Sequence, residues 1–240
     1  MTPQKSRPGA GSAYASSNDS NHITIGMVRN AHDPRITLRA LSWREFCQDL
    51  SRAEVRETKD GKGFVLAQFD TMHRAGKNVA AVSALGFDVD GKEQAPLPPL
   101  VAHTELLRLG WAHVVYSTWS HSAESPRYRI IIALDAPLHP DVLRDAQSYV
   151  VDQLPGAIAQ AIDRACLADR ARLYYAPATS PDRAGEFEFY SGGSAPLSAR
   201  TLTLTDIATR ATPEDEREWG VRRWRIEVEQ VFGDSIPTLT

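Results

Sequence analysis

Two aspartates, Asp88 and Asp90, stand two residues apart at the end of the segment 85–91, LGFDVDG. This apolar run closes on an Asp-Gly pair, which predicts a strand that ends in a turn. Residues two apart in a strand point to the same face, so both carboxylates would project together while Phe87 and Val89 face the core. Mg²⁺ prefers such oxygen ligands, and two such ions would serve phosphoryl or nucleotidyl transfer. The pattern also fits an ordinary strand with an Asp-Gly turn.

A histidine and two arginines follow in a predicted hairpin. The sequence STWSH, residues 117–121, ends the first strand at His121, and PRYR opens the second strand. Arg127 and Arg129 alternate along that strand and so share a face. Since arginine binds phosphate oxygens bidentately, these three side chains could hold a triphosphate. The alternative is an exposed strand face with solvated arginines and a histidine in a turn.

A third acidic position lies further along the chain. Asp163 follows Ile162 and could complete a carboxylate cluster with the first two aspartates, or it could be a surface residue of a helix. Asp169 is the rival for the same role, and the spacing does not choose between them. Arg172, three residues later, could reach a phosphate or pair with a carboxylate.

The elements that must position these residues mix helix and strand patterns. Ser42 and Glu45 form a capping box that predicts a helix over 43–55. Further helices are predicted at 104–109, 140–154, 157–168 and 213–232, and strands at 79–89, 112–118, 127–134, 173–175 and 186–190. This order indicates an α/β (α+β) fold with hairpins rather than a regular β-α-β alternation.

Composition and periodicity suggest three regions. Residues 1–22 are rich in small and polar residues without periodicity, which is typical of a disordered tail. Residues 23–212 carry the predicted elements and form the expected catalytic domain. Residues 213–240 form the expected C-terminal amphipathic helix and tail. With 42% hydrophobic and 24% charged residues, the chain is not mainly disordered, collagenous or a disulfide scaffold.

Charge and cysteine content narrow the class of protein further. The formal net charge of −3 argues against a basic coat over the whole surface, but a local basic groove is enough to bind nucleic acid. Cys47 and Cys166 form no CxxC pair, so they are expected to be reduced core residues in a reducing compartment. The apolar runs are far shorter than the ~18 residues of a membrane span, and no signal peptide is evident. We therefore expect a cytoplasmic protein without a membrane partner.

Taken in this order, the motifs resemble the catalytic core of the archaeo-eukaryotic primase superfamily, above all the small primase-polymerases of plasmids and phages. The acidic strand motif would be Asp88-Val89-Asp90, the histidine motif would end at Ser120-His121, and the hydrophobic-acid motif would be Ile162-Asp163. The flanking sequences PRYR and RLYYAP add to the resemblance. One position departs from it, because Trp119 stands two residues before the histidine where the motif has serine.

The resemblance implies a fold, a function and a site. The fold would be an RRM-like antiparallel β-sheet with a packed N-terminal α/β lobe. The chain would be a DNA-dependent nucleotidyltransferase, a primase or primer-extending polymerase for a mobile element. It would use Mg²⁺ or Mn²⁺, nucleoside triphosphates and a single-stranded DNA template, with a replicative helicase as a candidate partner. The metal-binding acids would be Asp88, Asp90 and Asp163, and the nucleotide would contact His121 and Ser120. To these, charge and placement add Arg127, Arg129 and Arg172 as nucleotide-binding residues.

Two other functions fit the same residues. The carboxylates could serve a metal-dependent nuclease or phosphohydrolase, which would depend less on the histidine and the arginines because it holds no triphosphate. The chain could also be a non-catalytic DNA-binding module of a replication system, which would need no divalent metal.

Overall fold

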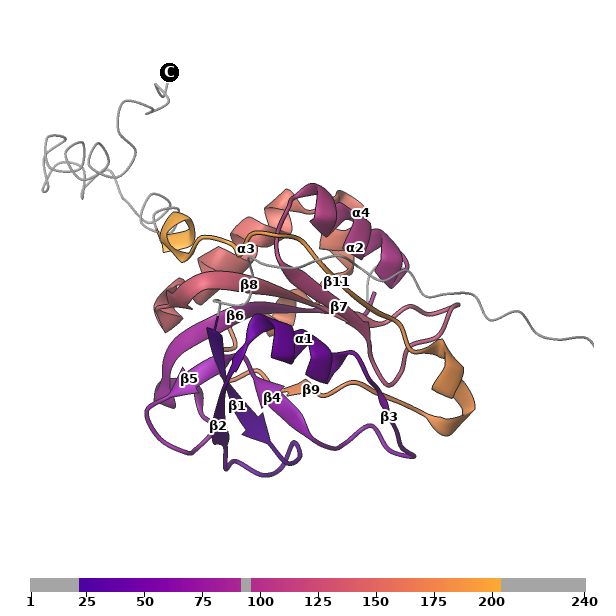
Figure 1. Ribbon diagram of the computed structural model, residues 1–240, viewed down its shortest axis with the longest axis horizontal. Coiled ribbons are helices and arrows are strands. Elements are labelled where there is room, and N and C mark those ends of the chain that lie inside the picture. Colours follow the sequence, from indigo (N-terminus) through magenta and orange to yellow (C-terminus); the bar gives the residue numbers. More distant parts are fainter. Residues whose placement is uncertain (1–21, 92–95, 204–240) are drawn as a thin grey trace, which may run out of the picture.

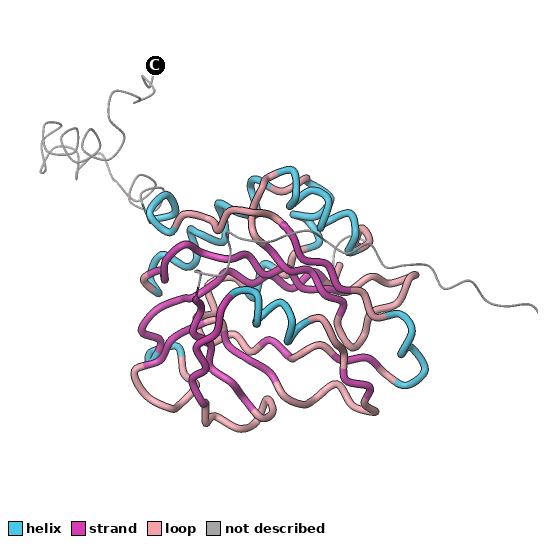
Figure 2. Tube along the Cα trace, viewed as in Figure 1, coloured by secondary structure: helices cyan, strands magenta, loops and turns pink. Residues whose placement is uncertain are grey.

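The computed structural model describes residues 22–91 and 96–203 of the chain. Two layers of β-structure face each other, and helices cover the outer side of the larger layer (Figures 1 and 2). The larger layer is a five-stranded antiparallel sheet in the order β11-β7-β8-β6-β5. Its strands are β5 (Ala67–Phe69), β6 (Val79–Val89), β7 (His113–Ser117), β8 (Tyr128–Leu138) and β11 (Phe189–Gly192).

The second layer is the N-terminal lobe. Its sheet has the order β2-β1-β4-β9, formed by β1 (His22–Val28), β2 (Thr37–Ser42), β4 (Gly63–Val65) and β9 (Tyr174–Tyr175), with helix α1 (Trp43–Leu50) alongside. A parallel pair joins β3 (Glu54–Val55) to β10 (Ala178–Thr179). Because β9 and β10 lie between β8 and β11 in the chain, the lobe is tied to the segment that connects two strands of the larger sheet.

Three α-helices lie on the outer face of the larger sheet, namely α2 (Pro99–Arg108), α3 (Leu143–Gln153) and α4 (Gly156–Ala161) (Figure 1). The structure also contains short 3₁₀ turns, η1 (Gly76–Asn78), η2 (Pro140–Val142), η3 (Arg164–Cys166) and η4 (Pro181–Glu186), and residues 199–203 are helical. The succession β6-α2-β7-β8-α3-β11 is a β-α-β-β-α-β arrangement. The predicted α+β fold, an antiparallel sheet with an N-terminal lobe, is confirmed. No helix in the described ranges is long and apolar enough to span a membrane.

Strand β6 is buried on both faces, and its alternation sets where the acids point. Phe87 and Val89 belong to the core cluster that includes Ala102 of α2, whereas Ala84 belongs to the cluster that includes Phe46 of the N-terminal lobe. Asp88 has the parity of Ala84, so its side chain lies between the larger sheet and the lobe. The bounds of β6 agree with the predicted strand 79–89.

Helix α1 begins as predicted and ends early. The Ser42 hydroxyl accepts from the backbone N–H of Glu45 at 3.2 Å, and the Glu45 carboxylate accepts from the backbone N–H of Ser42 at 2.8 Å, which is the capping box. The predicted extension to residue 55 is wrong, because the helix ends at Leu50 and residues 54–55 form β3. Pairing with β10 determines this segment more strongly than its helical pattern.

Other predicted elements differ from the structure in their bounds. The helix predicted at 104–109 begins at Pro99, and the strand predicted at 127–134 continues to Leu138. The helix expected over 157–168 stops at Ala161, because Ile162 forms an antiparallel bridge with Val89. The strand expected at 186–190 is β11, shifted to 189–192 behind the turn η4. Helix 140–154 begins as a 3₁₀ turn and becomes α-helical at Leu143. The predicted helix 213–232 and almost all of the predicted tail 1–22 lie outside the described residues.

Candidate functional site

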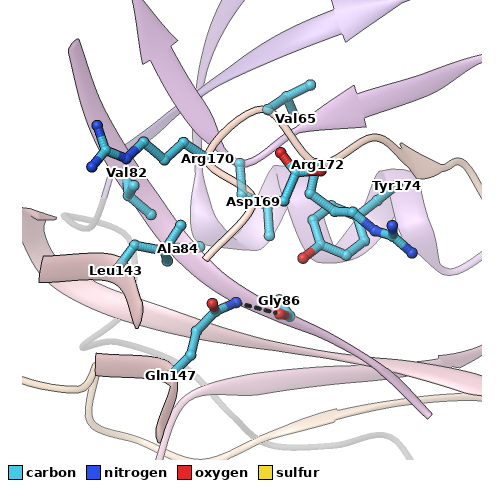
Figure 3. A pocket seen from close by; sticks show the side chains of 11 residues that line it. Val65, Val82, Ala84, Gly86, Leu143, Gln147, Asp169, Arg170, Arg172 and Tyr174 are labelled. Carbon is cyan, nitrogen blue, oxygen red and sulfur yellow. Dashed lines mark hydrogen bonds between the residues drawn. The ribbon is translucent and has the colours of Figure 1, made fainter. Parts of the chain in front are cut away.

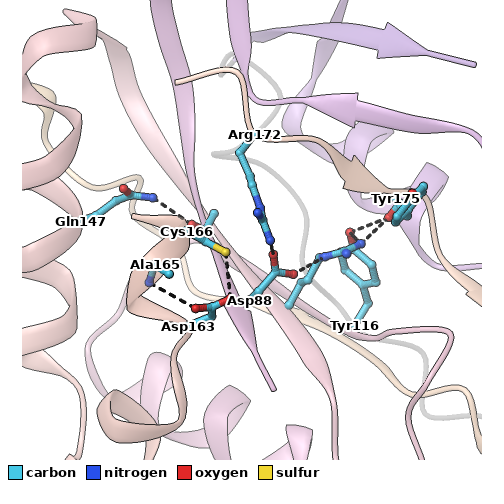
Figure 4. Close-up of polar contacts among 10 residues, drawn as sticks. Asp88, Tyr116, Gln147, Asp163, Ala165, Cys166, Arg172 and Tyr175 are labelled. Carbon is cyan, nitrogen blue, oxygen red and sulfur yellow. Dashed lines mark hydrogen bonds and ion pairs between the residues drawn. The ribbon is translucent and has the colours of Figure 1, made fainter. Parts of the chain in front are cut away.

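Asp88 forms ion pairs with two arginines. Its Oδ1 accepts from Nε of Arg129 at 2.6 Å, and its Oδ2 accepts from Nη2 of Arg172 at 2.7 Å (Figure 4). Arg129 lies directly opposite Asp88 in the register of β6 and β8, while Arg172 reaches down from the segment that leads into β9. Of the two possibilities for Arg172, the structure contains the carboxylate pair.

Arg129 is held on every side. Its Nη1 donates to the backbone carbonyl of Tyr175 at 2.7 Å and to the hydroxyl of Tyr116 at 3.3 Å. Its guanidinium also lies 5.8 Å from the ring centre of Tyr116 and 5.7 Å from that of Tyr174. A guanidinium in this position meets a carboxylate, two oxygen acceptors and two aromatic faces, so its charge is well compensated although the side chain is buried.

The charges around Asp88 keep it ionised. Burial raises the pKa of its carboxyl, but the charge and hydrogen bond of Arg129, followed by those of Arg172, outweigh burial and leave the pKa below its ordinary value. Asp88 is therefore a buried carboxylate at neutral pH.

The other two predicted acids lie beside the end of β6. Asp90 follows the last residue of β6, and its backbone N–H donates to the carbonyl of Ala161 at 3.3 Å. The backbone N–H of Asp163 donates to the carbonyl of Asp88 at 2.9 Å, next to the bridge between Val89 and Ile162. The structure thus brings the three positions together at one end of one strand.

The side chain of Asp163 is held by its own turn. Its Oδ1 accepts from the backbone N–H of Ala165 at 3.2 Å, and its Oδ2 accepts from the thiol of Cys166 at 2.9 Å (Figure 4). Burial, then the hydrogen bond to Asp163, raises the pKa of the Cys166 thiol to about 12, with smaller influences from Arg172 and Asp88. Cys166 is accordingly a neutral thiol placed among these charges, not a residue of a helical core pattern.

Asp169, the rival third acid, lies elsewhere. Its Oδ1 accepts from the backbone N–H of Ala171 at 3.1 Å, and it lines a cavity together with Arg170, Arg172, Tyr174 and Gly86 (Figure 3). No backbone bond joins it to β6 among the described residues. The geometry therefore favours Asp163 as the third acid.

The chemistry of the donors fits a hard divalent cation. Asp88, Asp90 and Asp163 offer carboxylate oxygens, and Mg²⁺ is usually held by one or two carboxylates together with substrate phosphates. Among the described residues, no three His, Cys, Asp or Glu side chains form a ready group of metal ligands. Each carboxylate oxygen of Asp88 already pairs with an arginine, so a cation at Asp88 would compete with these ion pairs. The set fits a metal that arrives with a phosphate ligand better than a closed protein cage.

His121 is buried, and both of its ring nitrogens have partners. Nδ1 accepts from the backbone N–H of Arg127 at 3.1 Å, and Nε2 lies 3.2 Å from Oε1 of Glu188. An Nδ1 that accepts a hydrogen bond carries no proton, so Nε2 is the protonated nitrogen and donates to Glu188. Through its two ring nitrogens, His121 joins the hairpin to the segment before β11.

The remaining predicted nucleotide contacts lie in the same hairpin. Ser120 is half-buried in the turn before His121. Ser117, rather than Ser120, uses its hydroxyl in the fold, because it accepts from the backbone N–H of Glu188 at 2.9 Å. Arg127 precedes β8, and no ion pair or hydrogen bond of its guanidinium occurs within the part of the chain that the structure describes.

A second, small hollow is lined in part by Arg129. We call it the basic-aromatic recess; it is lined by Arg56, Lys59, Tyr116, Thr118, Trp119, Arg129, Tyr175, Ala176 and Pro177. The indole N–H of Trp119 donates to the carbonyl of Arg56 at 3.0 Å, and the guanidinium of Arg183 lies 5.6 Å from the Trp119 ring centre. Cations and aromatic rings thus lie next to the Asp88 site.

Sequence reasoning missed several residues of this region. Glu188 was expected only as part of a strand, although its spacing from Tyr190 places both on one face, and the Tyr190 hydroxyl donates to Glu188 at 2.7 Å. Tyr116 was expected only as part of a strand, while Tyr175 belonged to the quoted RLYYAP segment. No sequence pattern indicated that Arg56 would lie near the site, because it is placed there by the pairing of β3 with β10.

Comparison with known proteins gives two matches. The family model described as the VapE N-terminal domain matches residues 21–202. Among solved structures, the AEP domain of the primase-polymerase of cyanophage S-2L is similar, with a TM-score of 0.43 and 10% sequence identity, over 76% of this chain and 89% of that chain. No curated protein matches. The family match covers both the N-terminal lobe and the larger sheet.

Proposed function

The chain belongs to the VapE N-terminal domain family, and we propose that it is a DNA-dependent nucleotidyltransferase of the primase-polymerase type. The observation that supports this most directly is the meeting of Asp88, Asp90 and Asp163 at the end of β6, with Arg172 on Asp88. Acids next to arginines suit a reaction that handles a divalent cation and a triphosphate together. A nuclease would need the acids but not a held triphosphate.

In this proposal the carboxylates hold the catalytic cation. When bound, Mg²⁺ or Mn²⁺ would lower the pKa of the attacking 3′-hydroxyl and neutralise charge on the phosphates. Asp88 and Asp90 would be the principal ligands, because they share one strand end, and Asp163 would complete the set. Arg172 and Arg127, which are half-buried whereas Arg129 is buried, would bind phosphate oxygens.

The basic-aromatic recess would receive the single-stranded template. Aromatic rings such as Trp119 and Tyr175 give nucleobases a stacking surface, and Arg56 and Lys59 would contact the phosphate backbone. Since these contacts are largely electrostatic, template binding would weaken as salt rises. Ser120 and His121 lie at the same hairpin end and would support the nucleotide side of the site.

Nucleotide incorporation by a pair of variants tests this function. Wild-type protein is incubated with single-stranded DNA, labelled nucleotides and Mg²⁺ or Mn²⁺, with and without a primer. Asp90→Asn should abolish incorporation, whereas Asp152→Asn, an exposed residue of α3, should leave it at the wild-type level. Product without a primer identifies a primase, and product only with a primer identifies a primer-extending polymerase.

Three results would contradict the proposal. Incorporation by Asp90→Asn at the wild-type rate would show that Asp90 does not hold a catalytic metal ion. Cleaved DNA without incorporated nucleotide would indicate a nuclease. DNA binding without either reaction, and without binding of Mn²⁺, would indicate a non-catalytic module. The same assay with added helicase shows whether a replicative partner stimulates synthesis.

A further inference from the structure

The two arginines on Asp88 differ in their freedom to move. The side chain of Arg129 is 8% exposed and is bonded to Tyr116 and Tyr175 as well as to Asp88. The side chain of Arg172 is 33% exposed, and its hydrogen bonds within the described residues go to Asp88 alone, from Nε at 3.3 Å and from Nη2 at 2.7 Å. Within the described residues, the side chain of Arg172 can therefore leave Asp88 without breaking another hydrogen bond, whereas that of Arg129 cannot.

Arg172 lies beside a cavity as well as beside Asp88. It lines this cavity together with Asp169, Arg170 and Tyr174 (Figure 3). Burial lowers the pKa of the Arg172 guanidinium, but the bond and charge of Asp88 outweigh burial and raise it overall. The group keeps its charge in either position, and a fork of donors that leaves a carboxylate can bind a phosphate in the same bidentate way.

The charges in the site compete for Asp88. The formal charges of Asp88, Asp90 and Asp163 are −3 in sum, and Arg129 with Arg172 contributes +2, which leaves −1 for an arriving dication. If Arg172 left, the same acids would present −2. A cation and Arg172 are thus rivals for one carboxylate, while a triphosphate attracts both of them.

We propose that Arg172 makes metal binding conditional on the nucleotide, because its guanidinium neutralises Asp88 in the free protein and transfers to the triphosphate when nucleotide and metal bind together. This inference rests on the proposed function and adds its regulation. By linkage, whatever nucleotide does to metal affinity, metal does equally to nucleotide affinity. The ion pair would keep the site from holding a cation when no substrate is present.

Direct binding measurements test this coupling without any turnover. Mn²⁺ binding to the apoprotein is measured by electron paramagnetic resonance, and binding of a non-hydrolysable nucleoside triphosphate is measured by calorimetry with and without Mn²⁺. For Arg172→Gln we expect Mn²⁺ to bind roughly fivefold or more tightly without nucleotide, and the nucleotide to bind roughly fivefold or more weakly with Mn²⁺ present. Arg172→Lys keeps the charge but not the forked arrangement of donors. Its affinities for Mn²⁺ and for the nucleotide should lie between those of the wild-type protein and those of Arg172→Gln.

Arg170→Gln is the matched control. Arg170 lines the same cavity and loses the same charge on substitution, but its ion pair is with Asp141. It should change both affinities by less than twofold. Near-ultraviolet circular dichroism of each variant shows that the fold is retained, and Arg172→Lys repeats the test if Arg172→Gln does not fold.

The outcomes separate the coupling from the function. Mn²⁺ binding by Arg172→Gln that equals or falls below the wild-type affinity overturns the coupling, as does an equal gain in Arg170→Gln. If wild-type protein binds Mn²⁺ in a way that Asp90→Asn removes, the proposed metal site stands even when the coupling fails. If wild-type protein and Asp90→Asn bind Mn²⁺ alike, the metal site and the coupling fail together.

Discussion

The backbone N–H of Asp163 donates to the backbone carbonyl of Asp88 at 2.9 Å, so the first and third acids are joined by main chain rather than by their carboxylates. The adjacent bridge between Val89 and Ile162 strengthens this attachment. Substitution of the Asp163 side chain leaves both connections in place. The acidic site can therefore be altered chemically while its backbone framework is kept.

The third acid can be identified by a pair of variants. If Asp163 is a ligand of the proposed metal site, Asp163→Asn should reduce nucleotide incorporation by at least about 100-fold. Asp169→Asn should reduce it less than fivefold, since Asp169 caps Ala171 and has no backbone bond to β6 in the described ranges. Steady-state incorporation on a primed template measures both. The reverse ranking would make Asp169 the third acid.

Asp88 differs from the other acids because its removal should also affect folding. Asp88→Ala leaves the buried Arg129 without its carboxylate, and we expect the free energy of unfolding to fall by about 3 kcal/mol. Urea denaturation at pH 7 measures this loss, with Asp90→Ala as the comparison, which should lose less than about 1 kcal/mol. Equal stabilities of the two variants would show that the buried pair contributes little.

Substitution of His121 can show whether this residue is structural only or also binds nucleotide. His121→Ala removes the acceptor of the Arg127 backbone N–H and the partner of Glu188, so the free energy of unfolding should fall by about 1–3 kcal/mol. If His121 also contacts phosphate, KM for nucleotide rises in His121→Ala but stays near the wild-type value in Glu188→Gln. Equal rises in both variants would indicate that only the hairpin geometry matters. Binding of labelled single-stranded DNA provides the reference that should not change.

The sequence predicted the acidic strand well because its signal is local. An apolar run and the Asp-Gly pair define β6 without help from distant residues, and the capping box defines the start of α1 in the same way. The hairpin of β7 and β8 also follows from two apolar runs with a short polar connection. The order of the motifs then indicated the resemblance to the archaeo-eukaryotic primase superfamily.

Long-range pairing explains what the sequence could not show. Residues 54–55 and Ile162 leave their helical patterns because each pairs with a strand far away in the chain. The partners of Asp88 and His121 come from β8, from the segment that leads into β9 and from the segment before β11. The spacing of residues along the sequence does not predict contacts between such distant segments. Arg129 was expected to face a triphosphate, but its position opposite Asp88 depends on the register of β6 with β8.

Substitution of Gly86 tests whether the close packing of β9 against β6 is needed for stability. A Cβ at this position would lie 2.6 Å from the Tyr174 ring and 2.8 Å from a methyl of Leu66. Gly86→Ala should therefore lower the free energy of unfolding by about 1–3 kcal/mol through overpacking, and should move Arg172 and Tyr175 away from Asp88. Gly185→Ala, where a Cβ meets nothing within 4 Å, is the matched control and should change the stability by less than about 0.5 kcal/mol. A Gly86→Ala variant with wild-type stability would show that β9 can move back at no cost.

His113 should make stability fall in mild acid. It is fully buried, its Nδ1–H donates to the carbonyl of Trp111 at 2.7 Å, and its Nε2 lies 2.9 Å from Nδ1 of His103. Burial lowers the pKa of His113 from 6.5 to about 4. The pKa is thus lower in the folded state than in the unfolded chain.

Between pH 6.5 and 4 the unfolded chain binds the proton that folded His113 refuses, so the free energy of unfolding should fall by up to about 3 kcal/mol as the pH drops through this window. The contribution is complete above pH 6.5 and does not change there. Urea denaturation at several pH values should give a flatter profile for His113→Gln, while His139→Asn, which alters an exposed histidine, should keep the wild-type slope. A wild-type slope in His113→Gln would assign the acid sensitivity to another group, of which His103 is the nearest because burial lowers its pKa as well.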